Sequence, residues 1–180
     1  MKISVAMAYY NGGMYIEEQM DTILTQLSEQ DEVIVSVDGA SDGSKSLLLK
    51  MAEEDKRIHV IKGPGKGVVK NFENAIRHCS GEIIYLSDQD DIWKPDKVKK
   101  VNEAFLNPKV KAVLHDARIV DECGNPTGAE GLFANRGSRK GILKNLVKNS
   151  YVGCCMAFRR ELIPVICPIP KEMYMHDYWI

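Results

Sequence analysis

Short apolar runs alternate with longer amphipathic segments through the first half of the chain. The apolar runs are rich in β-branched residues and predict buried strands at 3–8, 33–37, 58–61 and 83–86. Between them, apolar residues recur every three or four positions, which predicts helices at 13–27, 44–54 and 68–79. Strands that alternate with helices favour parallel βαβ units, whose helices cover both faces of the sheet. The predicted fold class is therefore α/β with a mostly parallel central sheet.

The second half of the chain has a less regular pattern. It predicts a long strand at 110–120, a mobile glycine-containing loop at 128–140, a short helix at 142–147 and another strand at 151–158. A further helix is expected after Trp93, because Pro95 suits the start of a helix. With 180 residues, the chain fits a single domain that buries one sizeable core.

Composition and charge exclude some classes of protein. Lys and Arg number 24 and Asp and Glu number 25, so no overall positive field exists to hold nucleic acid, and no nucleic-acid partner is expected. The apolar N-terminal stretch is too short for a transmembrane helix and lacks a signal-peptide cleavage pattern, so a cytoplasmic protein is expected. The five Cys show no metal-type spacing, and we interpret them as reduced, apolar fillers.

A local basic run stands out against this balanced charge. Its members are Arg136, Arg139, Lys140, Lys144 and Lys148. The run could cover an anionic ligand or contact the inner face of a membrane, and the alternative is a plain solvated surface. Peripheral membrane contact therefore stays open at this point.

The strongest chemical signal is Asp88-Gln89-Asp90-Asp91, which ends the fourth predicted strand. In open α/β sheets, ligands bind at the carboxyl ends of the strands. Three carboxylates in four residues repel one another unless a cation offsets their charge. Mg²⁺ and Mn²⁺ take oxygen ligands and often complete their shell with substrate phosphates. The motif therefore predicts a metal-diphosphate site, and the alternative is an acidic turn that caps the following helix.

Polar residues follow the other predicted strands as well. Asp38 could accept a hydrogen bond from a nucleotide base or a ribose, or it could form a turn with Gly39. The Gly-Pro-Gly-Lys-Gly segment at 63–67 could approach a diphosphate, with Lys66 as counter-charge, or it could be a plain flexible loop. Tyr10 could stack on a base or be partly core.

One more acid lies among aromatic residues near the end of the sequence, in His176-Asp177-Tyr178-Trp179. Burial beside large aromatic side chains can raise the pKa of a carboxyl group, which suits a general base. The alternative is a surface acid that flanks two core aromatics. The sequence pattern alone leaves both interpretations open.

Four motifs occur in the order found in family 2 glycosyltransferases. They are Val5 to Gly12, Val37 to Asp42, Leu86 to Trp93 and His176 to Trp179. The chain thus resembles, over its whole length, this family of inverting enzymes with the Rossmann-like GT-A fold, and its Asp-Gln-Asp-Asp-Ile-Trp form is similar to the rhamnosyltransferase-like subgroup. The resemblance implies transfer of a hexose from a nucleotide-diphosphate sugar to a glycan or lipid-linked glycan, in the synthesis of bacterial surface polysaccharide.

The resemblance also implies which residues bind the nucleotide. Tyr10 and Asn11 would lie beside the base, and Asp38 would contact it, while Lys66 remains the candidate counter-charge for the diphosphate. Two positions depart from the family's Asp-Asp-Gly-Ser pattern. Val37 stands where the family has its first acid and Ala40 where it has Ser, which puts the strength of nucleotide binding and the base preference in question.

The acidic motifs take the remaining implied roles. Asp88 and Asp90 would contact the nucleotide sugar, and Asp90 and Asp91 would hold a divalent metal, Mn²⁺ or Mg²⁺, against the diphosphate. Asp177 would be the catalytic base that takes the proton of the acceptor hydroxyl.

The resemblance further implies how the single domain is divided. Residues 1–93 would bind the nucleotide, and residues 94–180 would carry the acceptor and catalytic part, which we expect to be cut short because the family usually continues beyond its base motif. Three alternatives remain: a sugar nucleotidyltransferase, a phosphatase that uses an Asp-x-Asp pair, and a nucleotide-sugar-binding domain without activity. The first would need a glycine- and arginine-rich N-terminal loop, and the second would carry its acids after the first strand.

Overall fold

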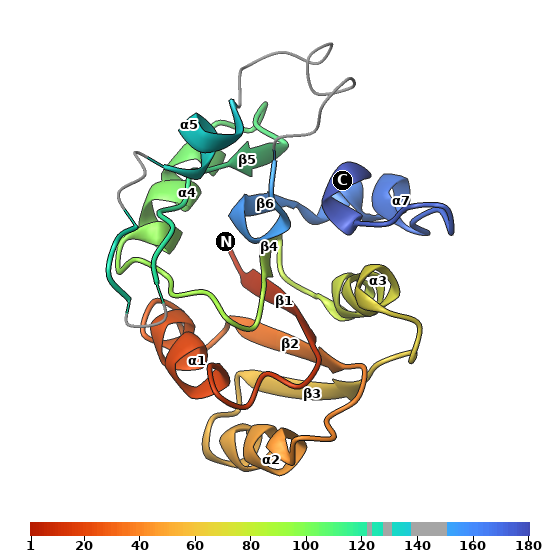
Figure 1. Cartoon of the computed structure of the whole chain (residues 1–180). Helices are drawn as coiled ribbons and strands as arrows, with labels where there is room; N and C mark the ends of the chain where they lie inside the picture. Colours follow the sequence, from red (N-terminus) through yellow and green to blue (C-terminus); the bar gives the residue numbers. More distant parts are fainter. Residues whose placement is uncertain (122–123, 128–130, 138–150) are drawn as a thin grey trace.

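One mixed sheet forms the centre of the molecule. The computed structural model describes residues 1–121, 124–127, 131–137 and 151–180. In this part of the chain, six strands lie in the order β3-β2-β1-β4-β6-β5 (Figure 1). Their bounds are β1 Ile3–Tyr9, β2 Glu32–Val37, β3 Ile58–Lys62, β4 Ile83–Ser87, β5 Ala112–Leu114 and β6 Met156–Arg159. The first four strands are parallel, whereas β6 lies antiparallel between β4 and β5, so the predicted mostly parallel α/β sheet is confirmed.

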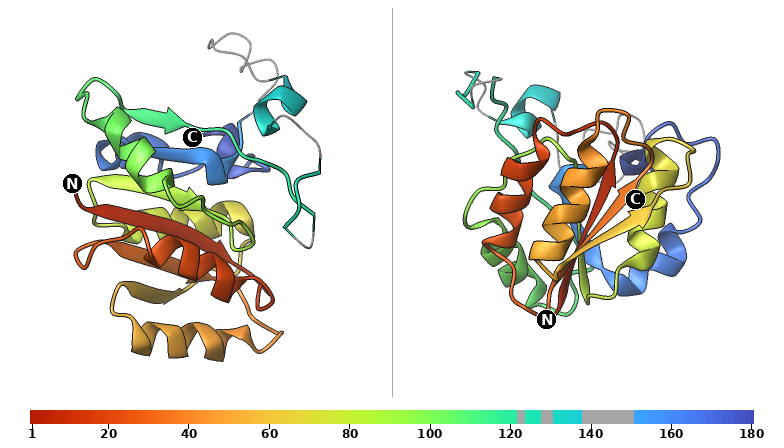
Figure 2. Two further views of the ribbon diagram at one scale, coloured as in Figure 1. Left: turned by 90° about the vertical axis from the view of Figure 1, so that its left-hand side faces the viewer. Right: turned by 90° about the horizontal axis from the view of Figure 1, so that it is seen from below.

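Helices cover both faces of this sheet (Figures 1 and 2). Their bounds are α1 Ile16–Leu24, α2 Ser44–Glu54, α3 Val68–His78, α4 Lys97–Phe105, α5 Leu132–Arg136 and α7 Ile163–Ile166. Short 3₁₀ turns are η1 Gly153–Cys155, η2 Arg160–Leu162 and η3 His176–Tyr178. Side chains alternate along β1, so that Val5 and Met7 join a core with α1, α2 and α4, while Ala6 joins a second core with α3 and α7.

The sequence prediction is wrong in three places in the second half. The predicted strand at 110–120 pairs only over β5, because the chain then leaves the sheet and its later apolar residues are exposed. The predicted strand at 151–158 begins with the η1 turn and pairs only from β6 onward. The predicted loop at 128–140 contains helix α5. The helix predicted at 142–147, and the basic run beyond Arg136, lie outside the described residues.

The parallel strands place their carboxyl ends at one edge of the sheet. The loops that follow β1, β2, β3 and β4 therefore meet there, which is where ligands bind in open α/β sheets. Within the described residues, no helix has the length and apolar character needed to cross a membrane.

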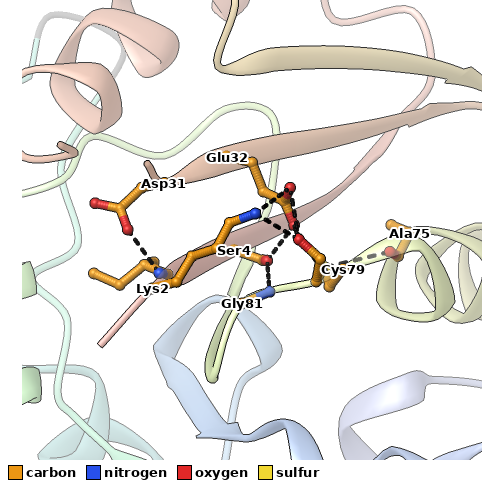
Figure 3. A network of polar contacts seen from close by, with 9 residues as sticks. Lys2, Ser4, Asp31, Glu32, Ala75, Cys79 and Gly81 are labelled. Carbon is orange, nitrogen blue, oxygen red and sulfur yellow. Dashed lines mark hydrogen bonds and ion pairs between the residues drawn. The ribbon is translucent and has the colours of Figure 1, made fainter. Parts of the chain in front are cut away.

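A buried carboxylate fixes the opposite edge of the sheet (Figure 3). Glu32 Oε1 accepts hydrogen bonds from Ser4 Oγ at 2.5 Å and from the Ser80 amide at 2.7 Å, and Lys2 Nζ lies 3.2 Å from its Oε2. Burial by itself would raise the pKa of Glu32, but the hydrogen bonds from Ser4, Ser80 and Lys2 outweigh it and hold the pKa at about 2. The ionised carboxylate thus ties β1, β2 and the turn before β4 together.

Replacement of Glu32 with Gln is expected to lower the free energy of unfolding at pH 7 by about 1–3 kcal/mol, because buried donors lose a charged acceptor. The pKa in the folded state lies below the ordinary value of 4.5, so this stabilisation is full above pH 4.5 and is lost as the pH falls towards 2. Urea unfolding at several pH values should therefore show the wild type and Glu32→Gln converging in acid. Glu54→Gln, an exposed control, should change the stability by less than about 0.5 kcal/mol. A constant difference between pH 7 and pH 2 would contradict this account.

Candidate active site

The loops after β1 and β4 are joined by one side-chain amide. The Tyr10 amide donates to Gln89 Oε1 at 2.7 Å, and Gln89 Nε2 donates to the Tyr10 carbonyl at 2.9 Å. The Gln89 amide also fills the space beside Gly12, where an added Cβ would lie 2.5 Å from its Cδ. Gln89 therefore positions the predicted nucleotide loop against the acidic loop, a role that the sequence did not reveal.

Tyr10 and Asn11, which are predicted to lie beside the base, both contact the loop after β2. The Ser41 amide donates to Asn11 Oδ1 at 2.9 Å, and Asn11 Nδ2 donates to Ser41 Oγ at 3.0 Å. Asn11 has a φ of 48°, a left-handed conformation that asparagine tolerates better than most residues. The Tyr10 ring next to it is 62% exposed and lies close to Gly39, so it is not a core residue and its face is accessible to a flat ligand.

Asp38 organises the glycine-rich loop after β3. Its carboxylate accepts hydrogen bonds from the amides of Gly65 and Gly67, the second at 2.9 Å. The carboxylate thus binds a neighbouring loop through backbone amides, and the Asp38 side chain joins the ends of β2 and β3. Lys66 stands exposed between these two glycines. The loop at 63–67 is therefore held in place at the same sheet edge as Tyr10, as the prediction of a diphosphate-facing loop requires.

Three possible metal ligands converge after β4. Oxygen atoms of Asp88 and Asp91 and the Sγ atom of Cys154 all lie within 4.8 Å of one another, while Asp90 is exposed beside them. Burial raises the pKa of Asp88 to about 7, and the charges of Asp91, Asp90 and Asp177 act in the same direction. Of the two predicted metal ligands, the structure brings Asp91 into this group and leaves Asp90 at its rim.

The late acid joins the same site. Asp177 lies in η3 and is only 8% exposed, so the alternative of a surface acid is wrong. Its charge makes a minor contribution to the raised pKa of Asp88. Next to it, the buried His176 ring stacks on Phe72 with centroids 3.8 Å apart and fills the space where a Cβ on Gly153 would lie. This packing fixes the segment that carries Asp177 against the turn that carries Cys154.

A lysine that the sequence analysis did not identify supports the acidic group. Lys97 Nζ donates to the Cys154 carbonyl at 3.0 Å and lies 3.9 Å from the centre of the Trp93 ring. Burial lowers the pKa of Lys97 to about 8, although the neighbouring thiols and the carboxylates of Asp91 and Asp88 partly oppose this effect. The ammonium group offsets some of the negative charge gathered after β4.

A cavity of about 660 Å³ opens beside the acidic group. Its walls come from α1, the acidic loop, α4, the chain after β5 and the η1 turn, and they include Asp90, Asp91, Trp93, Lys97, His115 and Cys154. A cavity of this size, with carboxylates on one side and an aromatic ring on another, has room for a sugar ring and its linkage.

Comparison with known proteins decides the family. Residues 4–166 match the family described as glycosyl transferase family 2. The chain belongs to glycosyl transferase family 2. This assignment favours sugar transfer over the nucleotidyltransferase and phosphatase alternatives, which the sequence had left open.

Two similar proteins are glycosyltransferases according to their names. A putative teichuronic acid biosynthesis glycosyltransferase, TuaG of Bacillus subtilis, is 33% identical to this chain. The match covers 69% of this chain and 50% of TuaG. The Escherichia coli WfgD, a UDP-Glc:α-D-GlcNAc-diphosphoundecaprenol β-1,3-glucosyltransferase, is 26% identical to this chain. The match covers 99% of this chain and 67% of WfgD. The chain spans about half the length of the first two curated relatives it matches.

Solved structures confirm the GT-A fold of this family 2 chain. The mannosyltransferase from Pyrobaculum calidifontis, in complex with GDP-Man and Mn²⁺, superposes with a TM-score of 0.71 at 22% identity. The match covers 98% of this chain and 49% of the mannosyltransferase. At this identity the likeness establishes the fold, and what that enzyme binds remains a property of that enzyme.

The two departures from the family 2 pattern have a structural explanation. Val37 ends β2 as part of the core beneath α2, and Ala40 packs against the same core from the loop that follows. A carboxylate at position 37 would lose its hydration there, a cost that the valine side chain avoids.

Proposed function

We propose that this chain is the donor-binding and catalytic part of an inverting hexosyltransferase that uses a nucleoside-diphosphate sugar. One observation supports this most strongly. In a family 2 chain, the loops with Tyr10, Asp38 and Lys66, the acidic group after β4 and the late Asp177 all lie at one edge of the sheet. In this proposal residues 1–93 bind the nucleotide, and residues 94–180 contribute to the acceptor and catalytic side.

The donor would lie across the loops at the sheet edge. The exposed Tyr10 ring would stack on the base, with Asn11 beside it. Lys66 would face the diphosphate as its counter-charge, while the amides of Gly65 and Gly67 on either side of it stay bonded to Asp38 and hold the loop in place. Asp88 and Asp90 would contact the ribose and the sugar-phosphate end. The base is left open, since the names of similar proteins include both UDP and GDP donors.

The acidic group fits a divalent cation. Asp88 and Asp91 supply oxygen donors within 4.8 Å, and Asp90 stands exposed where a diphosphate oxygen would complete the shell. Oxygen donors of this kind suit Mn²⁺ or Mg²⁺. When bound, such a cation would stabilise the negative charge that develops on the departing diphosphate.

Asp177 would carry out the proton transfer. Its carboxylate would accept the proton of the acceptor hydroxyl while that oxygen forms a bond to the anomeric carbon. The bond from this carbon to the diphosphate oxygen would break on the opposite side, and the nucleoside diphosphate would leave with the electron pair. This single displacement inverts the configuration of the anomeric carbon.

The acceptor would be a glycan or a lipid-linked glycan, as the names of TuaG and WfgD suggest for those relatives. The cavity beside Asp91 and Trp93 offers room for its terminal sugar. A lipid-linked acceptor would place this chain at the inner face of the cytoplasmic membrane, in the synthesis of surface polysaccharide.

Thermal stability in the presence of nucleotides tests the proposal. UDP, TDP, GDP, ADP and CMP would each be added with Mn²⁺, and again with a chelator. One nucleoside diphosphate with Mn²⁺ is expected to raise the midpoint of unfolding, by an amount that corresponds to about 2.7 kcal/mol at a hundredfold excess over Kd. CMP, which lacks a diphosphate, is the control. No stabilisation by any diphosphate would contradict the proposed function.

A further inference from the structure

A thiol faces the carboxylates after β4. Cys154 Sγ lies within 4.8 Å of the ligand oxygens of both Asp88 and Asp91, and the residue is only 9% exposed. The sequence interpretation treated this cysteine as an apolar filler. Neither of the two core clusters in the described residues includes Cys154, although the residues that follow in β6 belong to them. The buried thiol thus has the carboxylates of Asp88 and Asp91 as neighbours.

The turn that carries Cys154 is fixed from two sides. Lys97 Nζ binds the Cys154 carbonyl at 3.0 Å, and the buried His176 ring packs where Gly153 lacks a Cβ. The sulfur position is thus set by packing around it, as a ligand of a metal site needs to be. Metal–oxygen bonds of about 2.0–2.2 Å and metal–sulfur bonds of about 2.3 Å separate donors by at most about 4.5 Å, so small side-chain movements would bring all three donors onto one ion.

We propose that Cys154 Sγ is a third protein ligand of the cation held by Asp88 and Asp91, and that the site therefore prefers thiophilic ions to Mg²⁺. This inference rests on the proposed function and specifies its metal. Binding would replace the S–H bond with a sulfur–metal bond and release the proton to solvent. A thiolate ligand favours Co²⁺, Zn²⁺ and Cd²⁺ over Mg²⁺, which takes oxygen ligands almost exclusively.

The alternative is that the thiol only donates a hydrogen bond to a carboxylate. Cys154 does act on Asp88 in this way, because its hydrogen bond lowers the pKa that burial raises. In that case the site would bind through oxygen alone, and replacement of the thiol by a hydroxyl would leave the metal preference unchanged. The two interpretations therefore differ in the bond between sulfur and metal.

Titration with Co²⁺ alone, followed by absorption spectroscopy, distinguishes them. The wild type is expected to show a near-ultraviolet sulfur-to-cobalt charge-transfer band. Cys154→Ser should lose this band, and Cys155→Ser should keep it, because the adjacent thiol is not part of the group. Calorimetry should show that Cys154→Ser weakens Cd²⁺ binding more than tenfold and changes Mg²⁺ binding less than threefold.

A second measurement uses the wild type only and does not depend on how the variants fold. Cd²⁺ should slow the alkylation of Cys154 by iodoacetamide, as measured by mass spectrometry of its peptide. Co²⁺ binding without a charge-transfer band, or alkylation at an unchanged rate in saturating Cd²⁺, would overturn the sulfur ligand and leave the proposed function intact. Failure to bind any of these ions would overturn the inference and the metal of the proposed function together, whereas failure of donor binding itself would show in the nucleotide panel.

Discussion

Asp177→Asn is expected to reduce sugar transfer by about 10²–10⁴-fold while donor binding stays within a few fold of wild type. The amide has the shape of the carboxylate but cannot take the proton of the acceptor hydroxyl. The side chain is buried in η3, and the substitution keeps its shape, so the change should leave the nucleotide loops unaltered.

Transfer would be followed as acceptor-dependent release of nucleoside diphosphate, and donor binding by calorimetry. Glu172→Gln is the matched control, because it removes the same charge from an exposed position in the same segment. Transfer by Asp177→Asn at a rate near that of the wild type would show that another group takes the proton. Equal loss of donor binding and transfer would instead indicate that Asp177 holds the donor.

Asp91→Asn is expected to abolish the part of nucleotide binding that depends on Mn²⁺. Loss of a group that only supports a metal ligand typically costs 10–100-fold in affinity, and loss of a ligand itself should cost at least as much. Asp91 belongs to the group that converges in the structure and to the pair predicted from the sequence, so both arguments lead to the same residue.

Calorimetry with Mn²⁺ and the preferred diphosphate would measure this effect. Asp90→Asn tested in parallel shows whether the exposed carboxylate also binds the ion, as the sequence predicted. Asp96→Asn is the control, because its partly exposed carboxylate pairs with Lys100 outside the acidic group. Unchanged Mn²⁺ affinity in Asp91→Asn would place the cation elsewhere.

The sequence predicted the first half of the fold because its signals are local. Strands such as β2 and helices such as α2 follow from β-branched runs and helical periods within a few residues, and α2 matches its predicted bounds. The second half depends on contacts between distant segments. β6 lies between β4 and β5, and the exposed apolar residues after β5 do not join the sheet; Val120 instead forms an isolated bridge with Pro126. An apolar pattern alone does not distinguish such a segment from a long strand.

The candidate site likewise contains residues that local sequence signals predicted and residues whose roles depend on contacts between distant segments. Asp38, Asp88 and Asp177 were predicted because each belongs to a motif at a strand end or among aromatic residues. Lys97 and Cys154 were not predicted, since each acquires its role only when α4 and the η1 turn pack beside the acidic loop. The role of Gln89 was not predicted either, because the carboxylates on both sides of it are the stronger chemical signal in the sequence.

The two hydrogen bonds between Gln89 and Tyr10 pair a side-chain amide with the backbone, in the way that opposite residues of an antiparallel sheet pair with each other. They join the loop after β1 to the loop after β4, beyond the last backbone partners of these two parallel strands. A nucleotide that orders the first loop would then also order the acidic group, and a cation at the acidic group would raise the affinity for the nucleotide. Thermodynamic linkage makes the two effects equal in size, so a single amide would set how strongly nucleotide and cation cooperate.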